Sequence, residues 1–235
     1  QNDGQINEIE IIILSCYLPL NSSKILVKKL LNYKSSDTAF NNLILTQIKE
    51  PLEEIRLKKS INSLKKITDN VSKKVKKQYE ENPYPRWKYA YQHLPEEVIN
   101  IINHEIKPNN IDYNEKLIYP NVLVAGCGTG SHLNNITKYK NAKITGVDLS
   151  LSSLAYAKRK MIELGFNNID FLQADILDLK NMNNRFDIIE SIGTLHHMND
   201  PIEGLKSLIN ILNSQLRAWI IILGRMAFLS SHLLL

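Results

Sequence analysis

Residues 121–130 read Asn-Val-Leu-Val-Ala-Gly-Cys-Gly-Thr-Gly, and this stretch decides the fold. Its apolar run, Val122-Leu123-Val124, is of the kind that a fully buried strand needs. The glycines that follow allow a tight turn and let a ligand approach the backbone closely. We therefore expect a strand that delivers a ligand-binding turn to the start of a helix.

The same alternation of strand and helix continues downstream. Further apolar runs predict strands at 143–147, 169–172, 186–191 and 219–223, and amphipathic stretches predict helices at 131–139, 151–164 and 201–213. Alternating strands and helices favour a parallel sheet that is covered on both faces. The predicted class is α/β, with five parallel strands in a Rossmann-like arrangement that binds ligands at the carboxyl ends of its strands.

Residues 1–82 have helical periodicity, with capping residues such as Asp69 between the periodic segments. A helix that starts after Asp69 places Val71, Val75 and Tyr79 on one face and most of a lysine cluster on the other, formed by Lys73, Lys74, Lys76 and Lys77. This cluster is either a solvated helix face or an anion-binding patch, and it lacks the aromatic residues of a strand-binding surface. We expect three regions: a helical N-terminal region (1–82), a connector or lid (83–120) and the α/β domain (121–235).

Composition excludes several protein classes. The chain has 235 residues, of which 43% are hydrophobic and 23% charged, which are ordinary globular values. Two cysteines are too few for a disulfide scaffold and favour a reducing cytoplasm. The formal net charge is +5, but the lysine, isoleucine and asparagine bias is typical of AT-rich coding, so it does not indicate nucleic-acid binding. No stretch predicts a targeting or membrane-spanning segment.

The spacing of the glycines restricts the class of ligand that the turn is expected to bind. A dinucleotide fingerprint has glycine at its first, third and sixth positions, but here the third glycine is Gly130 at the fifth position, and Ser131 is at the sixth. No Gly-Lys-Ser/Thr follows, so the turn is not a P-loop either. The pattern favours a nucleoside ligand without a pyrophosphate.

Acidic residues follow the second and third predicted strands. Asp148 lies 22 residues after Gly126, where a carboxylate can accept hydrogen bonds from both ribose hydroxyls. The alternative is that it caps the next helix, which Ser150 could do equally well. Asp175, followed by Ile176, could recognise an adenine edge and face, or it could cap the next turn.

Two adjacent histidines, His196 and His197, follow the fourth predicted strand. They could supply a catalytic base, or they could be structural. We expect no metal site, because adjacent histidines point apart and no cysteine or acidic cluster joins them.

The connector contains Asn-Pro-Tyr-Pro-Arg-Trp at 82–87, and its two prolines exclude helix. Its large side chains, with Tyr79 before them, predict either a lid over a pocket or a rigid connector that plugs into the domain surface. The candidate lid residues are Tyr79, Tyr84, Arg86 and Trp87.

Together these motifs resemble class I S-adenosylmethionine-dependent methyltransferases over about 110 to 120 residues. The segments at 126–130, 147–157 and 79–87 are similar to bacterial methyltransferase domains that are often joined to tetratricopeptide repeats. By this resemblance such repeats would lie upstream of Gln1. The chain would then be a cytoplasmic slice of a longer polypeptide.

The resemblance implies roles for individual residues. The turn, with Ala125, would hold the methionine end of S-adenosylmethionine, Asp148 its ribose, and Leu149 would flank the adenine. Asp175 and Ile176 would recognise the adenine, and Glu190 would lie where the fourth strand reaches cofactor and acceptor. The implied cofactor-binding set is Ala125, Gly126, Cys127, Gly128, Gly130, Asp148, Leu149, Asp175, Ile176 and Glu190.

The resemblance also implies a C-terminal hairpin of two further strands, and the sequence after about Asn213 looks unlike the family. We therefore expect this chain to fold poorly or to be inactive by itself. The expected function is methyl transfer to a protein, sugar or small molecule. A non-catalytic binding or scaffold fragment and an NAD-dependent oxidoreductase are the alternatives.

Overall fold

A computed structural model describes residues 6–91, 93–105, 117–213 and 219–223. The chain divides into two compact units, Gln1–Leu57 (unit 1) and Lys58–Leu235 (unit 2). Every helix in the described part of the chain is too short or too polar to cross a lipid bilayer.

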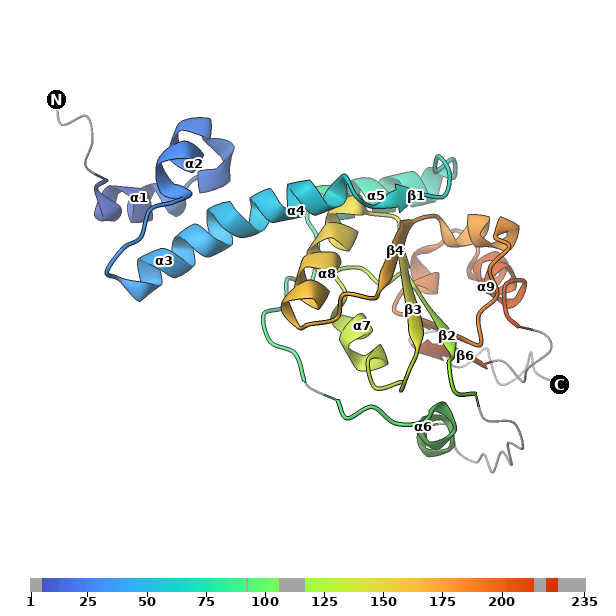
Figure 1. Ribbon diagram of the computed structural model, residues 1–235. Helices are drawn as coiled ribbons and strands as arrows, with labels where there is room; N and C mark the ends of the chain where they lie inside the picture. Colours follow the sequence, from blue (N-terminus) through green and yellow to red (C-terminus); the bar gives the residue numbers. More distant parts are fainter. Residues whose placement is uncertain (1–5, 92, 106–116, 214–218, 224–235) are drawn as a thin grey trace. The chain divides into compact units, whose positions relative to one another are not determined.

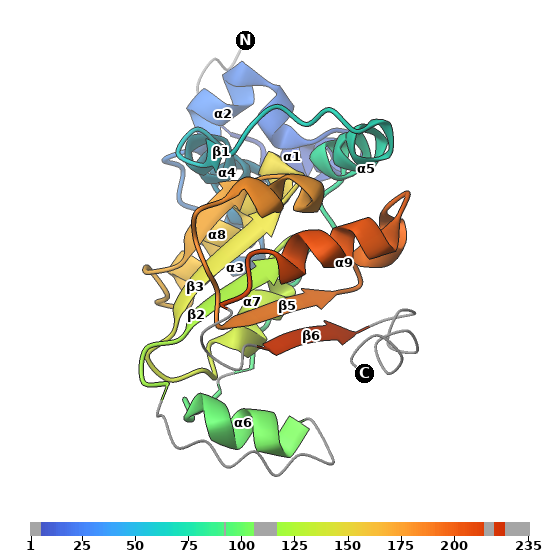
Figure 2. The same ribbon diagram turned by 90° about the vertical axis from the view of Figure 1, so that its right-hand side faces the viewer.

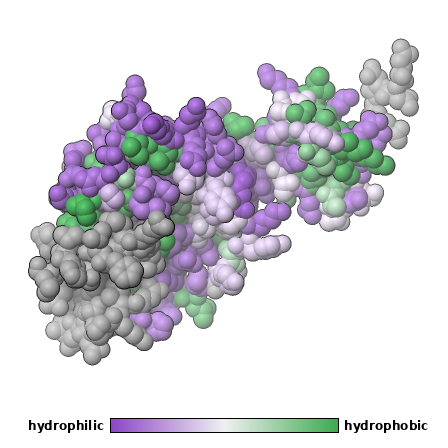
Figure 3. All heavy atoms as spheres, turned by 180° about the vertical axis from the view of Figure 1, so that it is seen from behind, coloured by the Kyte–Doolittle hydropathy of each residue, from purple (hydrophilic) through white to green (hydrophobic). Residues whose placement is uncertain are grey.

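Unit 1 is helical, as its periodicity predicts (Figure 1). Side-chain oxygens cap three of its helices, and Asp37, for example, accepts from the amides of Ala39 and Phe40. The buried core contains Phe40, Ile44 and Ile48. Hydrophobic residues also appear on its outer surface in Figure 3. The elements are α1 (Glu8–Ser15), a 3-10 turn (Leu20–Ser22), α2 (Lys24–Leu30), α3 (Thr38–Ile44), a π-turn (Leu45–Lys49) and α4 (Glu50–Lys58).

Unit 2 is built on a parallel sheet with the strand order β1-β4-β3-β2-β5-β6. The order reverses at β2, so the edge between β2 and β5 is the switch point where ligands bind in such sheets. All five predicted strands are present, which confirms the α/β prediction; β1 is additional. The strands are β1 (Asn62–Ser63), β2 (Asn121–Ala125), β3 (Lys143–Asp148), β4 (Asp170–Gln173), β5 (Ile188–Ile192) and β6 (Trp219–Leu223).

Helices cover both faces of this sheet, with α7 and α8 on one side and α9 on the other (Figures 1 and 2). Residues alternate along β2, so Leu123 and Ala125 join the buried cluster that includes Leu208 of α9. The helices are α5 (Asn70–Glu81), α6 (Val98–Glu105), α7 (Ser131–Ile136), α8 (Leu151–Glu163) and α9 (Pro201–Ile209), with 3-10 turns η3 (Ile176–Asn181) and η4 (Leu195–His197).

Some element ends differ from the sequence prediction. Helix α7 ends at Ile136 rather than at 139, and α9 ends at Ile209 rather than at 213. Both end in turns whose amides bond back to the last helical carbonyls, which hydrophobic periodicity does not register.

The compact unit begins at Lys58, so α5 belongs to the same unit as the sheet, whereas the sequence places a region boundary at residue 82. Among the described residues, β6 lies at one edge of the sheet, next to β5. The predicted departure from the family after Asn213 falls mostly on 214–218 and 224–235, which lie outside the described residues.

The turn after β2 depends on Gly126. Its φ is +75°, and a Cβ there would lie 2.2 Å from Oγ1 of Thr194. Gly128 also has a positive φ, +52°, but a Cβ there would meet nothing within 4 Å.

We expect Gly126→Ala to lower the free energy of unfolding by about 2–5 kcal/mol, because strain and overpacking add. Gly128→Ala should cost about 1–2 kcal/mol, from backbone strain alone. Urea denaturation of both variants measures the difference, and equal losses would show that Thr194 does not constrain the turn.

Candidate functional site

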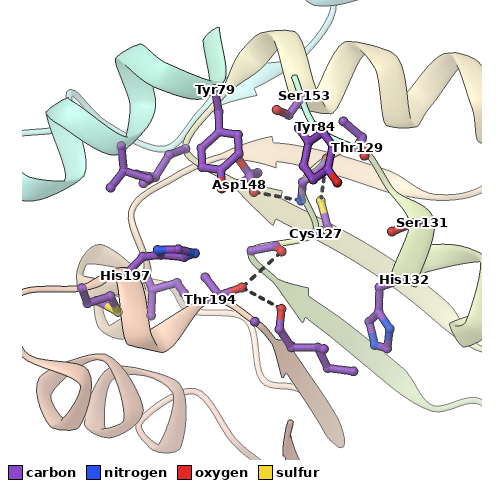
Figure 4. Close-up of a pocket in the computed structure, with 18 of the residues that line it drawn as sticks. Tyr79, Tyr84, Cys127, Thr129, Ser131, His132, Asp148, Ser153, Thr194 and His197 are labelled. Atoms are coloured by element: carbon purple, nitrogen blue, oxygen red, sulfur yellow. Dashed lines mark hydrogen bonds between the residues drawn. The ribbon is translucent and has the colours of Figure 1, made fainter. Parts of the chain in front are cut away.

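A cavity of about 470 Å³ opens at the carboxyl ends of β2, β3 and β5, with α5 along one side (Figure 4). This volume is in the range of small-molecule and cofactor sites. Sequence-predicted residues that line it are Tyr79, Tyr84, Gly126, Cys127, Gly128, Asp148, Leu149, Asp175, Ile176 and His197.

The glycine turn folds onto the end of β3. The amides of Gly126 and Cys127 both donate to the carbonyl of Val147, at 2.8 and 2.9 Å. Ala125 lies at the end of β2, fully buried, and is not among the lining residues. Gly130 does not line the cavity either, because it packs against α8, where a Cβ would lie 2.8 Å from that of Ala157.

Asp148 is the principal charged group of the cavity wall. Its carboxylate accepts from the amides of Gly128 and Ser150, both at 2.9 Å. Ser150 itself caps α8, so Asp148 is not the N-cap. Burial raises the pKa of Asp148 above its ordinary value, and the hydrogen bonds from these amides oppose that shift.

Cys127 lines the cavity but is not a nucleophile. Burial, with the Asp148 charge as the second cause, raises the pKa of its thiol well above the ordinary value. The thiol therefore stays protonated at neutral pH, and only the thiolate is strongly nucleophilic.

Leu149 follows β3, and Asp175 and Ile176 follow the neighbouring strand β4; all three line the cavity together with Asp148. The carboxylate of Asp175 accepts from the amide of Leu177 at 3.0 Å and caps η3, so the capping alternative is confirmed. Because this bond uses Oδ1, Oδ2 can still accept from a ligand.

Glu190 does not line the cavity, which differs from its predicted place beside cofactor and acceptor. It is buried, and its two oxygens bond to the hydroxyl of Tyr139 and to Nε2 of His132, each at 2.6 Å. It therefore orients His132, which does line the cavity and which sequence reasoning missed. The sequence feature that could have indicated His132 as a site residue is its position at the start of α7, directly after the glycine turn.

The two predicted histidines occupy different places. His197 lines the cavity, on the side opposite His132 (Figure 4), whereas His196 does not line it, although both side chains are exposed. Burial, followed by the neighbouring charge of His196, lowers the pKa of His197. His197 is therefore neutral at neutral pH, in the form that can accept a proton.

The segment around the two prolines both lines the cavity and is attached to the sheet domain. Tyr79 and Tyr84 line the cavity, but Arg86 and Trp87 do not. The indole Nε1 of Trp87 donates to the carbonyl of Thr129 at 2.9 Å. The guanidinium of Arg86 lies 4.4 Å from the ring centroid of Tyr156 on α8. These contacts hold the backbone that carries Tyr84 at the cavity mouth.

Glu80 fixes α5 against the start of α8. Its carboxylate accepts from the Leu151 amide and the Ser152 hydroxyl, each at 2.7 Å, and pairs with Lys58 at 2.6 Å. Burial raises the pKa of Glu80, but these hydrogen bonds outweigh it and leave the pKa below its ordinary value. These bonds also hold the preceding residue of α5, Tyr79, at the cavity.

No group of three or more metal-ligating side chains gathers within the described ranges.

Comparison with known proteins places this cavity in a family context. A family model described as "Methyltransferase domain" matches residues 122–215. A protein of Synechococcus described as uncharacterized is 38% identical over 96 residues, which are 38% of this chain and 22% of that protein. A ubiquinone biosynthesis O-methyltransferase of Nitrosomonas europaea is 29% identical over 116 residues, 47% of this chain and 48% of that protein. The chain thus spans about half or less of these relatives.

Among solved structures, PKMT2 of Rickettsia typhi in complex with AdoHcy is 29% identical, with a TM-score of 0.38, over 43% of this chain and 20% of that chain. The family match and the parallel sheet support a class I methyltransferase domain, and S-adenosylmethionine is the cofactor of this class.

The residues present fit that cofactor. Gly128 faces open space, so a ligand can approach its backbone. The cavity lining includes two carboxylates and two aliphatic side chains: Asp148, Asp175, Leu149 and Ile176. A nucleoside needs such hydrogen-bond acceptors and an apolar surface for its ring.

The buried Glu190 predicts unequal costs for two tyrosine variants. Tyr139 donates to this carboxylate, whereas Tyr156 donates to a neutral carbonyl, that of Trp87. We expect Tyr139→Phe to lower the free energy of unfolding by about 1.5–3 kcal/mol and Tyr156→Phe by about 0.5–1.5 kcal/mol, because bonds to charged groups are stronger.

Chemical denaturation of both variants measures this difference. A Tyr139→Phe protein as stable as the wild type would contradict a stabilising hydrogen bond from Tyr139 to the buried carboxyl group of Glu190.

Proposed function

We propose that unit 2 binds S-adenosylmethionine in the cavity and transfers its methyl group to an acceptor. The observation that carries this proposal is the junction of Gly128 and Asp148, where a backbone open to a ligand lies beside a half-buried carboxylate. A carboxylate there can accept hydrogen bonds from both hydroxyls of a ribose.

The other cofactor contacts are proposed by matching polar lining residues to the polar parts of the cofactor and apolar residues to its adenine ring. The turn at Gly126–Gly128 holds the methionine end, and Asp148 binds the ribose. Leu149 and Ile176 pack on the faces of the adenine ring, and Oδ2 of Asp175 accepts from its amino group. All of these residues line the cavity.

Catalysis requires little more than alignment. When bound, the cofactor supplies a methyl group that its sulfonium already activates. The chain positions the acceptor in line with that group and excludes water with Tyr79 and Tyr84. A neutral ring nitrogen of His197 takes the acceptor's proton, where the acceptor carries one. His196 does not line the cavity, so it tunes its neighbour rather than touching the ligand.

The acceptor class stays open among protein, sugar and small molecule. One relative is named for ubiquinone biosynthesis, and a protein of Campylobacter fetus, 34% identical over 93 residues, is named a tRNA U34 carboxymethyltransferase. We propose further that the unit works within a longer, cytoplasmic protein that contains tetratricopeptide repeats.

Two alternatives predict different binding. A non-catalytic fragment would bind S-adenosylhomocysteine weakly or not at all. An oxidoreductase would prefer NAD, although the turn lacks the third glycine of the dinucleotide fingerprint.

Asp148→Ala should weaken S-adenosylmethionine binding roughly ten- to a hundred-fold, because one charge-assisted pair of hydrogen bonds is worth about 1.5–3 kcal/mol. Isothermal titration calorimetry of the full chain measures this loss. Asp170→Ala is the matched control, since this exposed aspartate lies on β4 outside the cavity and should leave the affinity unchanged.

An Asp148→Ala protein with wild-type affinity would remove Asp148 from the site. Tight binding of NAD together with no binding of S-adenosylhomocysteine would overturn the proposed function.

The raised pKa of Asp148 predicts a pH dependence. Protonation removes the charge that strengthens the ribose hydrogen bonds, so affinity for S-adenosylhomocysteine should be constant near neutral pH and fall as the pH is lowered. The decline should begin above the pH at which an ordinary aspartate, with a pKa of 3.8, titrates. Calorimetry over a pH series tests this, and Asp148→Asn should flatten the profile.

A further inference from the structure

A second hollow, of about 540 Å³, lies beside another face of α5 and contains none of the residues that line the cofactor cavity. Five lysines and one glutamate line it, which gives a formal surplus of four positive charges. The lining residues are Ser63, Lys65, Lys66, Ile67, Lys73, Lys76, Lys77, Glu80 and Gln173. We call this the lysine hollow.

The fold brings these lysines together from two segments. Lys65 and Lys66 follow β1, whereas Lys73, Lys76 and Lys77 lie on α5. The floor is formed in part by buried side chains, Ile67 at 7% and Gln173 at 4% exposure. Gln173 is held by bonds to Ser63 and to the carbonyl of Leu149, so the floor is rigid.

The acidic groups nearby do not neutralise the hollow. Glu80 turns toward α8 and is already bonded to Lys58 and to the start of that helix. Asp178 pairs with Lys65 at 2.8 Å. Of the five described lysines that line the hollow, four form no ion pair with a carboxylate: Lys66, Lys73, Lys76 and Lys77.

These charges also repel one another. Lys73 is three residues from Lys76 and four from Lys77, spacings at which like charges destabilise a helix. A bound anion would relieve this repulsion. Lysine ammonium groups bind phosphate as point charges, without the planar geometry that arginine imposes.

We propose that the lysine hollow binds a compact phosphorylated small molecule through its phosphate groups. The volume of the hollow suits such a ligand, and its four lysines without an ion-pair partner supply positive charge for clustered phosphates. The lining contains no aromatic residue on which a nucleic-acid base could stack, so the hollow favours a small polyanion over a nucleic-acid strand.

The test uses sodium tripolyphosphate as the probe, titrated calorimetrically into the full chain at about 50 mM and about 200 mM salt. We expect binding at low salt that weakens at high salt. Lys76→Gln/Lys77→Gln should bind about tenfold more weakly, because it removes two of the four lysine charges that have no ion-pair partner. This double variant should remain folded, because removing like charges relieves repulsion.

The control is Lys140→Gln/Lys206→Gln, which removes the same charge from α9 and from the segment after α7 and should bind like the wild type. A second pair, Lys66→Gln/Lys73→Gln, should repeat the loss. S-adenosylhomocysteine affinity should be the same in every variant, so this test is independent of the proposed function.

Three results would overturn the proposal. One is no tripolyphosphate binding at low salt. Another is equal weakening in the hollow and control variants, which would indicate a diffuse charge effect. The third is tighter binding of an oligouridylate of about 12 nucleotides, lost in the same variants, which would make the hollow a nucleic-acid surface.

Discussion

The hydrogen bond from the Gly128 amide to the Asp148 carboxylate joins the ends of β2 and β3, and the cavity depends on it. Parallel pairing sets Ala125 opposite Val147, so the residues that follow the two strands must emerge side by side. The turn can then bend onto the Val147 carbonyl only because Gly126 has a positive φ and no side chain beside Thr194. Backbone geometry thus places an acid where a ligand meets the open turn.

A second constraint closes the cavity from the side of α5. Glu80 binds the start of α8, and Trp87 binds the carbonyl of Thr129, so both ends of the intervening segment are attached to the sheet domain. Tyr84 lies between these two anchors and Tyr79 immediately precedes the first of them, and both tyrosines line the cavity. Side chains of this segment thus line the cavity and attach the segment to the sheet domain, while its action as a lid stays a prediction.

The strands, the turn and the place of Asp148 could be predicted because each depends on local pattern, an apolar run followed by glycine or an acid. His132 and Glu190 could not, because their pairing joins residues 58 positions apart through burial rather than sequence spacing. The family resemblance implies that Gly130 contacts the cofactor, but in the structure Gly130 packs against Ala157 of α8 and does not line the cavity. The lysines of α5 line a hollow only because the fold places Lys65 and Lys66, which follow β1, around the same hollow. Sequence spacing does not predict this arrangement.

A crystal structure of the full chain with S-adenosylhomocysteine tests whether Asp148 binds the ribose of the cofactor in this cavity. We expect both ribose hydroxyls within hydrogen-bond distance of Asp148, about 2.5–3.2 Å, and the adenine ring between Leu149 and Ile176. A ligand bound outside this cavity, or bound within it with Asp148 turned away from the ribose, would show that Asp148 does not have this role.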